Sequence, residues 1–77
     1  MSKTTTDVMI HTSSVLSEDQ FDEVARQVKA IDGVVRFDRN LHIPTLLMVV
    51  YKAGEVQALT ILNKLTRLGF NASLVGM

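Results

Sequence analysis

The stretch SEDQFDEVARQVKAIDGVVRF, residues 17–37, contains a helix, a stop signal and the start of a strand. Apolar residues recur over Ser17–Ile31 at the spacing of one helical face, namely Phe21, Val24, Ala25, Val28 and Ile31. Asp32-Gly33 follows, and glycine adopts the left-handed conformation that often ends a helix. Val34–Arg39 is rich in β-branched and aromatic residues and predicts a strand.

The start of this helix carries its own signal. Ser17 and Gln20 have the spacing of a capping box, in which each side chain accepts a hydrogen bond from the backbone N–H of the other residue. Glu18 and Asp19 place negative charge at the positive end of the helix dipole, worth about 0.3–1 kcal/mol each at an exposed site. We therefore predict a helix cap formed by Ser17, Glu18 and Gln20.

The remainder of the chain predicts three more strands and a second helix. The expected strands are Asp7–His11, Leu46–Tyr51 and Phe70–Val75. Asn40–Thr45 reads as a polar connection, where Pro44 disfavours a helix. The second helix is expected over Glu55–Leu68, ended by Gly69. Its expected inward residues are Val56, Leu59, Leu62 and Leu65, with Ala58, Ile61 and Leu68 widening the apolar face.

The order of these elements is strand–helix–strand twice over. Two such units predict an α+β fold of the ferredoxin-like βαββαβ type, a four-stranded antiparallel sheet with both helices on one face. With 77 residues the chain is long enough for one domain. We expect residues 1–6 to be a disordered lead-in and residues 7–77 to form that domain.

Composition excludes several classes of function. The chain has no cysteine, so it offers no thiolate metal ligand, redox pair or cysteine nucleophile. Eight basic and eight acidic residues are mixed along the chain, which gives nucleic-acid binding no electrostatic support. The polar N-terminus is unlike a signal peptide, and the longest apolar run, Leu46–Tyr51, is too short to insert into a membrane. We expect a soluble, cytoplasmic protein.

Three segments carry a resemblance to a known family: VMIH at residues 8–11, AIDGV at residues 30–34 and LGFNASLV at residues 68–75. In their order and spacing the chain resembles the heavy-metal-associated domain family from Asp7 to Val75. That family comprises small copper and mercury chaperones and the N-terminal modules of metal-transporting ATPases. The resemblance implies the same βαββαβ fold and a relationship to metal handling.

The metal loop of that family departs from its pattern in this chain. Its Gly-Met-x-Cys-x-x-Cys motif falls on Ser14, Val15, Ser17 and Gln20, so serine and glutamine occupy the two cysteine positions. Neither side chain is a soft ligand, and the thiolate chemistry of the loop is not carried over. Phe70 matches an aromatic residue that shields the metal in some relatives, and here we expect a core aromatic. The resemblance therefore implies a degenerate metal site.

Other candidate chemistry is sparse. Met9, His11 and Met48 are expected on one sheet face and form a conceivable soft site for copper(I). The interpretation we favour is that the methionines fill gaps and His11 is a half-exposed strand residue. His42 is expected to be a solvated loop residue. We find no nucleophile–base pattern or phosphate loop and expect neither an enzyme nor a cofactor.

The sheet face away from the helices is the more informative feature. If Val8 and Ile10 face the helices, alternate residues of the strands face the opposite side. The residues expected to form an interaction surface there are Met9, His11, Leu46, Met48 and Val50. Such a patch predicts self-association into a homo-oligomer or binding of a protein partner. Metal binding through Met9, His11 and Met48 is the alternative, and small-molecule sensing, by analogy of fold, is the third hypothesis.

Overall fold

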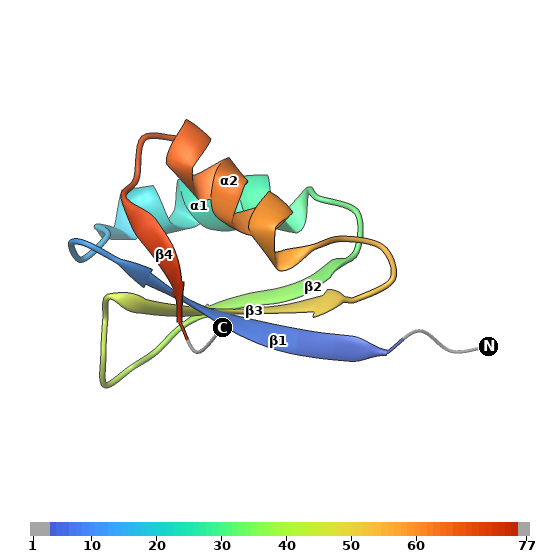
Figure 1. The fold of residues 1–77 in the computed structure, drawn as a ribbon. Coiled ribbons are helices and arrows are strands. Elements are labelled where there is room, and N and C mark those ends of the chain that lie inside the picture. Colours follow the sequence, from blue (N-terminus) through green and yellow to red (C-terminus); the bar gives the residue numbers. More distant parts are fainter. Residues whose placement is uncertain (1–3, 76–77) are drawn as a thin grey trace.

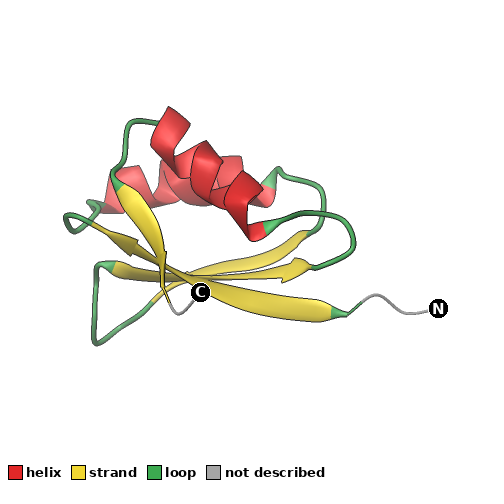
Figure 2. Ribbon diagram, viewed as in Figure 1, coloured by secondary structure: helices red, strands yellow, loops and turns green. Residues whose placement is uncertain are grey.

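The computed structural model describes residues 4–75 (Figure 1). The elements, in chain order, are β1 Thr5–Thr12, α1 Glu18–Lys29, β2 Val34–Arg39, β3 Leu46–Lys52, α2 Ala58–Arg67 and β4 Ala72–Val75. The strands form one antiparallel sheet in the order β2-β3-β1-β4. Both helices cover the same face of the sheet and leave the other open (Figures 1 and 2). The predicted ferredoxin-like fold is confirmed.

The first strand starts earlier than the sequence predicts. Thr5 pairs with Lys52 and Thr6 with Tyr51, so both threonines belong to β1 and not to a disordered lead-in. The Ala53 N–H also donates to the Thr4 carbonyl at 3.1 Å. Pairing with β3 extends the strand because a neighbour satisfies its backbone groups. The remaining lead-in residues 1–3 lie outside the described part of the chain.

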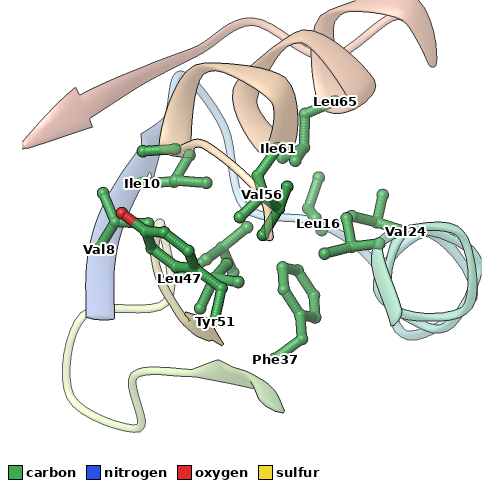
Figure 3. Packing of buried hydrophobic residues seen from close by; sticks show 13 residues of the cluster. Val8, Ile10, Leu16, Val24, Phe37, Leu47, Tyr51, Val56, Ile61 and Leu65 are labelled. Atoms are coloured by element: carbon green, nitrogen blue, oxygen red, sulfur yellow. The ribbon is translucent and has the colours of Figure 1, made fainter. Parts of the chain in front are cut away.

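The hydrophobic core lies between the sheet and the two helices (Figure 3). Inward residues of β1 and β3 are almost completely buried, among them Ile10, Leu47 and Val49 at 0% exposure. They meet helix residues that are equally buried: Val24, Val28, Ile61 and Leu65. The parity that places Val8 and Ile10 toward the helices is therefore the one the structure adopts, and the intervening residues of β1 and β3 face the open side.

The second helix is shorter than predicted. It begins at Ala58, not at Glu55, because residues 53–55 form a turn in which the N–H groups of Glu55 and Val56 donate to the Lys52 carbonyl. Its buried residues are Ala58, Ile61 and Leu65. Leu59, predicted to face inward, is 56% exposed. The face that holds Ala58, Ile61 and Leu65 packs inward, and this leaves Leu59 on the solvent side of the helix.

The two helix ends use glycine as predicted. Gly33 has a φ of +100° after α1 and Gly69 a φ of +98° after α2, both in the left-handed region that other residues rarely adopt. At Gly33 space is limited as well, since an added Cβ would lie 3.0 Å from Glu55 Cβ and Val56 Cγ1. Within residues 4–75, neither helix is long and apolar enough to cross a membrane.

Candidate functional site

Three connections meet at one end of the molecule, on the left of Figure 1: β1 to α1, β2 to β3, and α2 to β4. Two adjacent residues of β1 and its following loop tie them together. The Thr12 N–H donates to the Thr45 carbonyl at 2.8 Å, and the Ser13 N–H donates to the Asn71 carbonyl at 3.0 Å. The Thr12 hydroxyl, in a side chain only 1% exposed, donates to the Ser14 carbonyl at 2.8 Å. These bonds hold the loop end in a defined shape.

The two loop positions that the resemblance aligns with cysteines, Ser17 and Gln20, are used by the helix itself. The Ser17 N–H donates to Gln20 Oε1 at 2.9 Å, and the Gln20 N–H donates to Ser17 Oγ at 3.1 Å. Both hydrogen bonds of the expected capping box are thus present, with Glu18 and Asp19 in the first turn of α1. Each side chain is occupied in closing the helix start, so the loop offers no pair of free ligands.

A small hollow remains beside this cap, with a volume of about 210 Å³. Its lining is Thr12, Ser13, Ser14, Leu16, Gln20, Gly69, Phe70 and Asn71. Phe70 is half-buried against the core cluster, as expected of a core aromatic. Across residues 4–75, no group of three His, Cys, Asp or Glu side chains is placed to hold a metal ion. The lining of the hollow consists of hydroxyl, amide and apolar groups and includes no carboxylate or imidazole.

The open face of the sheet carries a different kind of surface. Met9 lies directly opposite Met48, Asp7 opposite Val50, and His11 opposite Leu46. All four apolar side chains of this block are half-buried by their neighbours, and His11 is exposed. We call Met9, Leu46, Met48 and Val50 the open-face patch. The structure brings all the residues predicted for an interaction surface onto this face, with His11 at its margin.

Charged residues line the β2 side of this patch. Arg36 pairs with Val50 and Asp38 with Met48 across the β2–β3 ladder, and the two charged side chains form an ion pair of 2.9 Å. The ladder shifts register between Val34 and Arg36, which marks a bulge in the edge strand. Bulges and charged side chains discourage another strand from adding to a sheet edge. The face is therefore a better contact surface than the β2 edge.

The sequence interpretation predicted the β2–β3 connection, residues 40–45, but not the exposure of its two apolar side chains. Leu41 is 93% exposed and Ile43 is 49% exposed. Figure 1 shows this loop extending to the side of the sheet away from the helices. The Asn40 side-chain oxygen accepts hydrogen bonds from the N–H groups of His42 and Ile43, at 2.7 and 2.8 Å, so the loop is an ordered Asx turn. In the sequence, the only indication of this exposed apolar surface is that Leu41 and Ile43 lie within the otherwise polar connection NLHIPT.

Comparisons with known proteins place this fold. No protein-family model and no curated protein sequence matches the chain. Solved structures do. Oxidized MerP from Ralstonia metallidurans CH34 has a TM-score of 0.80 at 12% sequence identity. The match covers 94% of this chain and 99% of the MerP chain. The copper transporter domain Ccc2a from yeast has a TM-score of 0.78 at 22% identity, covering 90% and 93%.

A third structure, a copper binding domain from the P-type ATPase HMA7, has a TM-score of 0.79 at 16% identity over 91% of this chain and 93% of its own. At these identities the likeness establishes the fold alone. The chain therefore has the fold of heavy-metal-associated domains, as its resemblance implied. It has no cysteine, so it cannot supply a thiolate ligand anywhere along its length.

Proposed function

We propose that this protein is a cytoplasmic, non-catalytic interaction module that binds protein through its open-face patch. The carrying observation is that Met9, Leu46, Met48 and Val50 form one apolar block on the sheet face that neither helix covers. Each of the four side chains is partly exposed, and the apolar surface that they leave in water costs free energy that association relieves.

The loop end supports the same proposal by what its residues do. Ser17 and Gln20 satisfy each other's backbone groups instead of presenting ligands. The loss of thiolate chemistry leaves the fold without the function implied by the family resemblance. The open-face patch is formed by the β-strands and does not depend on the loop. It is then the strongest candidate for the surface through which the protein acts.

Site-specific photo-crosslinking tests this proposal. A photoreactive amino acid replaces Val50 on the open face, and a matched variant carries it at Leu59, an exposed apolar position on α2. Both variants are expressed in the source organism, and adducts are identified by mass spectrometry. We expect one defined protein adduct, to the same chain or to another protein, from position 50 and none from position 59. Absence of adducts at position 50, or the same adducts at both positions, contradicts the proposal.

A second function is favoured by one observation, the direct pairing of Met9 with Met48 beside His11 on the same face. Two thioethers and an imidazole are ligands that suit copper(I). Titration with copper(I) tests it on the wild type, Met48→Leu and His42→Gln, the last being a control at the loop histidine. Binding tighter than about 1 µM that Met48→Leu abolishes and His42→Gln leaves unchanged supports a metal carrier. Weaker binding, or equal binding by all three proteins, excludes one.

A further inference from the structure

We propose that the outer edge of β4 binds an extended, uncharged segment of another protein, which adds to the sheet as a strand and places a side chain in a polar hollow beside β4. The strand β4 lies at one edge of the sheet (Figure 1). This binding goes beyond the proposed function, because the edge and the hollow share no residue with the open-face patch.

The hydrogen-bond pattern of the β1–β4 ladder identifies the backbone groups at this edge. The Ser13 N–H donates to the Asn71 carbonyl, at the start of the ladder. In an antiparallel ladder, hydrogen-bonded pairs alternate with pairs that exchange no hydrogen bond, so the next pair, Thr12–Ala72, exchanges none. Thr12 accordingly bonds to the β2–β3 loop instead. The N–H and C=O groups of Ala72 and Leu74 therefore point away from β1, and no residue among 4–75 pairs with them.

The two edges of the sheet differ in how they are protected. The β2 edge has a bulge and three charged residues, Arg36, Asp38 and Arg39. The segment 68–75 contains no charged residue and no proline, and the pairing of β4 with β1 has no register shift. Charges, prolines and bulges are the devices that keep other strands from adding to a sheet edge. The β4 edge lacks them, and its unpaired donors and acceptors match those of an extended peptide backbone.

The two faces of β4 define the residues that suit the added segment. Ala72 and Leu74 are half-buried and pack against the core, on the helix side of the sheet. Asn71 and Ser73 alternate with them and are exposed on the open side. Side chains of neighbouring strands on one face of a sheet contact each other. The segment therefore carries apolar residues on the helix side and polar residues on the open side.

A hollow of about 330 Å³ lies on that open side, lined by His11, Ser13, Asn71, Ala72 and Ser73. His11 is directly opposite Ser73 across the β1–β4 ladder. The lining offers an imidazole, an amide and two hydroxyls, and it includes no carboxylate, ammonium or guanidinium. A charged side chain would lose hydration there without gaining an ion pair, whereas a carboxamide finds both donors and acceptors.

The hollow also distinguishes another protein from a second copy of this chain. Between Ala72 and Val75, a second β4 carries a single polar side chain, the serine at position 73. Its hydroxyl reaches less far than a carboxamide and leaves most of the hollow unfilled. We therefore infer a segment with asparagine or glutamine at the position beside Ser73, flanked by apolar residues.

Selection from a phage-displayed library of random peptides, each about twelve residues long, tests this inference on the whole chain. Enriched peptides are synthesised, and their dissociation constants are measured by fluorescence anisotropy. We expect uncharged peptides in which asparagine or glutamine alternates with apolar residues. The dissociation constant should be about 100 µM, because the backbone of β4 offers only the outward groups of two residues.

Four variants locate the bound peptide. Ala72→Pro removes an outward N–H and leaves the hydrogen bonds to β1 in place, and Ser73→Lys puts a charge beside the hollow. Each should weaken binding at least tenfold. Val35→Pro, at the bulge of the opposite edge, and Met48→Glu, in the open-face patch, are the controls and should leave the dissociation constant unchanged.

Other outcomes overturn the inference. If no peptide is enriched, or if Ser73→Lys binds the enriched peptides as well as the wild type does, the β4 edge is not the site. The Ser73→Lys result decides alone if circular dichroism shows that Ala72→Pro is unfolded. Peptides whose binding only Met48→Glu weakens occupy the open-face patch, which contradicts this inference and supports the proposed function. A wild type that dimerises and becomes monomeric on Ser73→Lys assigns the edge to a second copy instead.

Discussion

The loop end around Ser17 and the open face around Met48 differ in how their groups are satisfied. At the loop end, backbone donors meet partners: Ser17 and Gln20 bond each other, and Thr12 and Ser13 bond neighbouring loops. On the open face, the apolar side chains of β1 and β3 are partly exposed, and neither helix covers that face (Figure 2). One region is closed by the chain's own bonds, and the other leaves apolar surface to solvent.

This difference teaches that the same local geometry can serve different chemistry, depending on the side chains placed on it. Two residues three positions apart at the start of a helix have their side chains close together. Two cysteines at this spacing suit a tetrahedral metal ion, whereas a serine and a glutamine, as in Ser17 and Gln20, suit a capping box. The open face does not depend on that choice, because its residues are set by strand parity. Each prediction below alters one of the two regions.

The largest effect is expected from reopening the loop. The double variant Ser17→Cys, Gln20→Cys removes the capping box and restores the cysteine spacing implied by the family resemblance. We expect zinc or copper(I) binding well below 1 µM, because two thiolates then share one ion. Titration against a chromophoric chelator measures it, with the single variant Ser17→Cys as control. A folded double variant that binds no more tightly than the single one shows that the two positions are assigned wrongly.

The next effect compares adjacent leucines on opposite faces of β3. Leu47 is completely buried beneath the helices, and Leu46 is half-buried on the open face. We expect Leu47→Ala to lower the free energy of unfolding by about 3 kcal/mol, through lost burial and an unfilled cavity. Leu46→Ala should lower it by less, about 1–2 kcal/mol, since part of the Leu46 side chain stays in water and its truncation leaves no enclosed cavity. Urea denaturation measures both.

Equal losses for the two leucines would contradict this comparison, because they would mean that the open face is packed as tightly as the core. A loss confined to Leu47→Ala would show that the apolar residues of the open face contribute little to the stability of the fold. Their presence would then be explained by contact with a partner.

The sequence predicted the elements well where local chemistry decides them. The capping box and Gly33 defined both ends of α1 to within about two residues, and β2 was predicted with its observed bounds. The open-face residues followed from period-two alternation once one face of β1 was oriented. These signals are contained in a few neighbouring residues, so no tertiary information was needed.

The errors lie where several local solutions compete. Val56 and Leu59 extend an apolar helical spacing to Glu55, yet Val56 is buried from a turn and Leu59 is exposed. Only packing against α1 and the sheet selects the face that holds Ile61 and Leu65. The exposure of Leu41 was not predicted for a related reason, because it depends on the path that the loop takes in the fold and not on the neighbouring residues in the sequence.

A smaller effect tests the cap itself. Ser17→Ala removes the oxygen that accepts from the Gln20 N–H, and we expect the free energy of unfolding to fall by about 1 kcal/mol. Ser14→Ala, in the same loop, is the control, because Ser14 contributes only its carbonyl to the hydrogen bond from Thr12. Thermal denaturation compares the two. Equal losses would show that the loop, and not the capping box, is what Ser17 stabilises.

The smallest effect concerns the charge at the closed helix start. Glu18 lies in the first turn of α1, where a carboxylate interacts favourably with the positive end of the helix dipole. We expect Glu18→Gln to lower the free energy of unfolding by about 0.5 kcal/mol at low salt, and by less at 0.5 M salt because exposed charges are screened. Asp32→Asn, beyond the opposite end of the helix, should not lower it. If both variants lose stability equally, net charge rather than the helix dipole is responsible, and the loop end is stabilised by its hydrogen bonds alone.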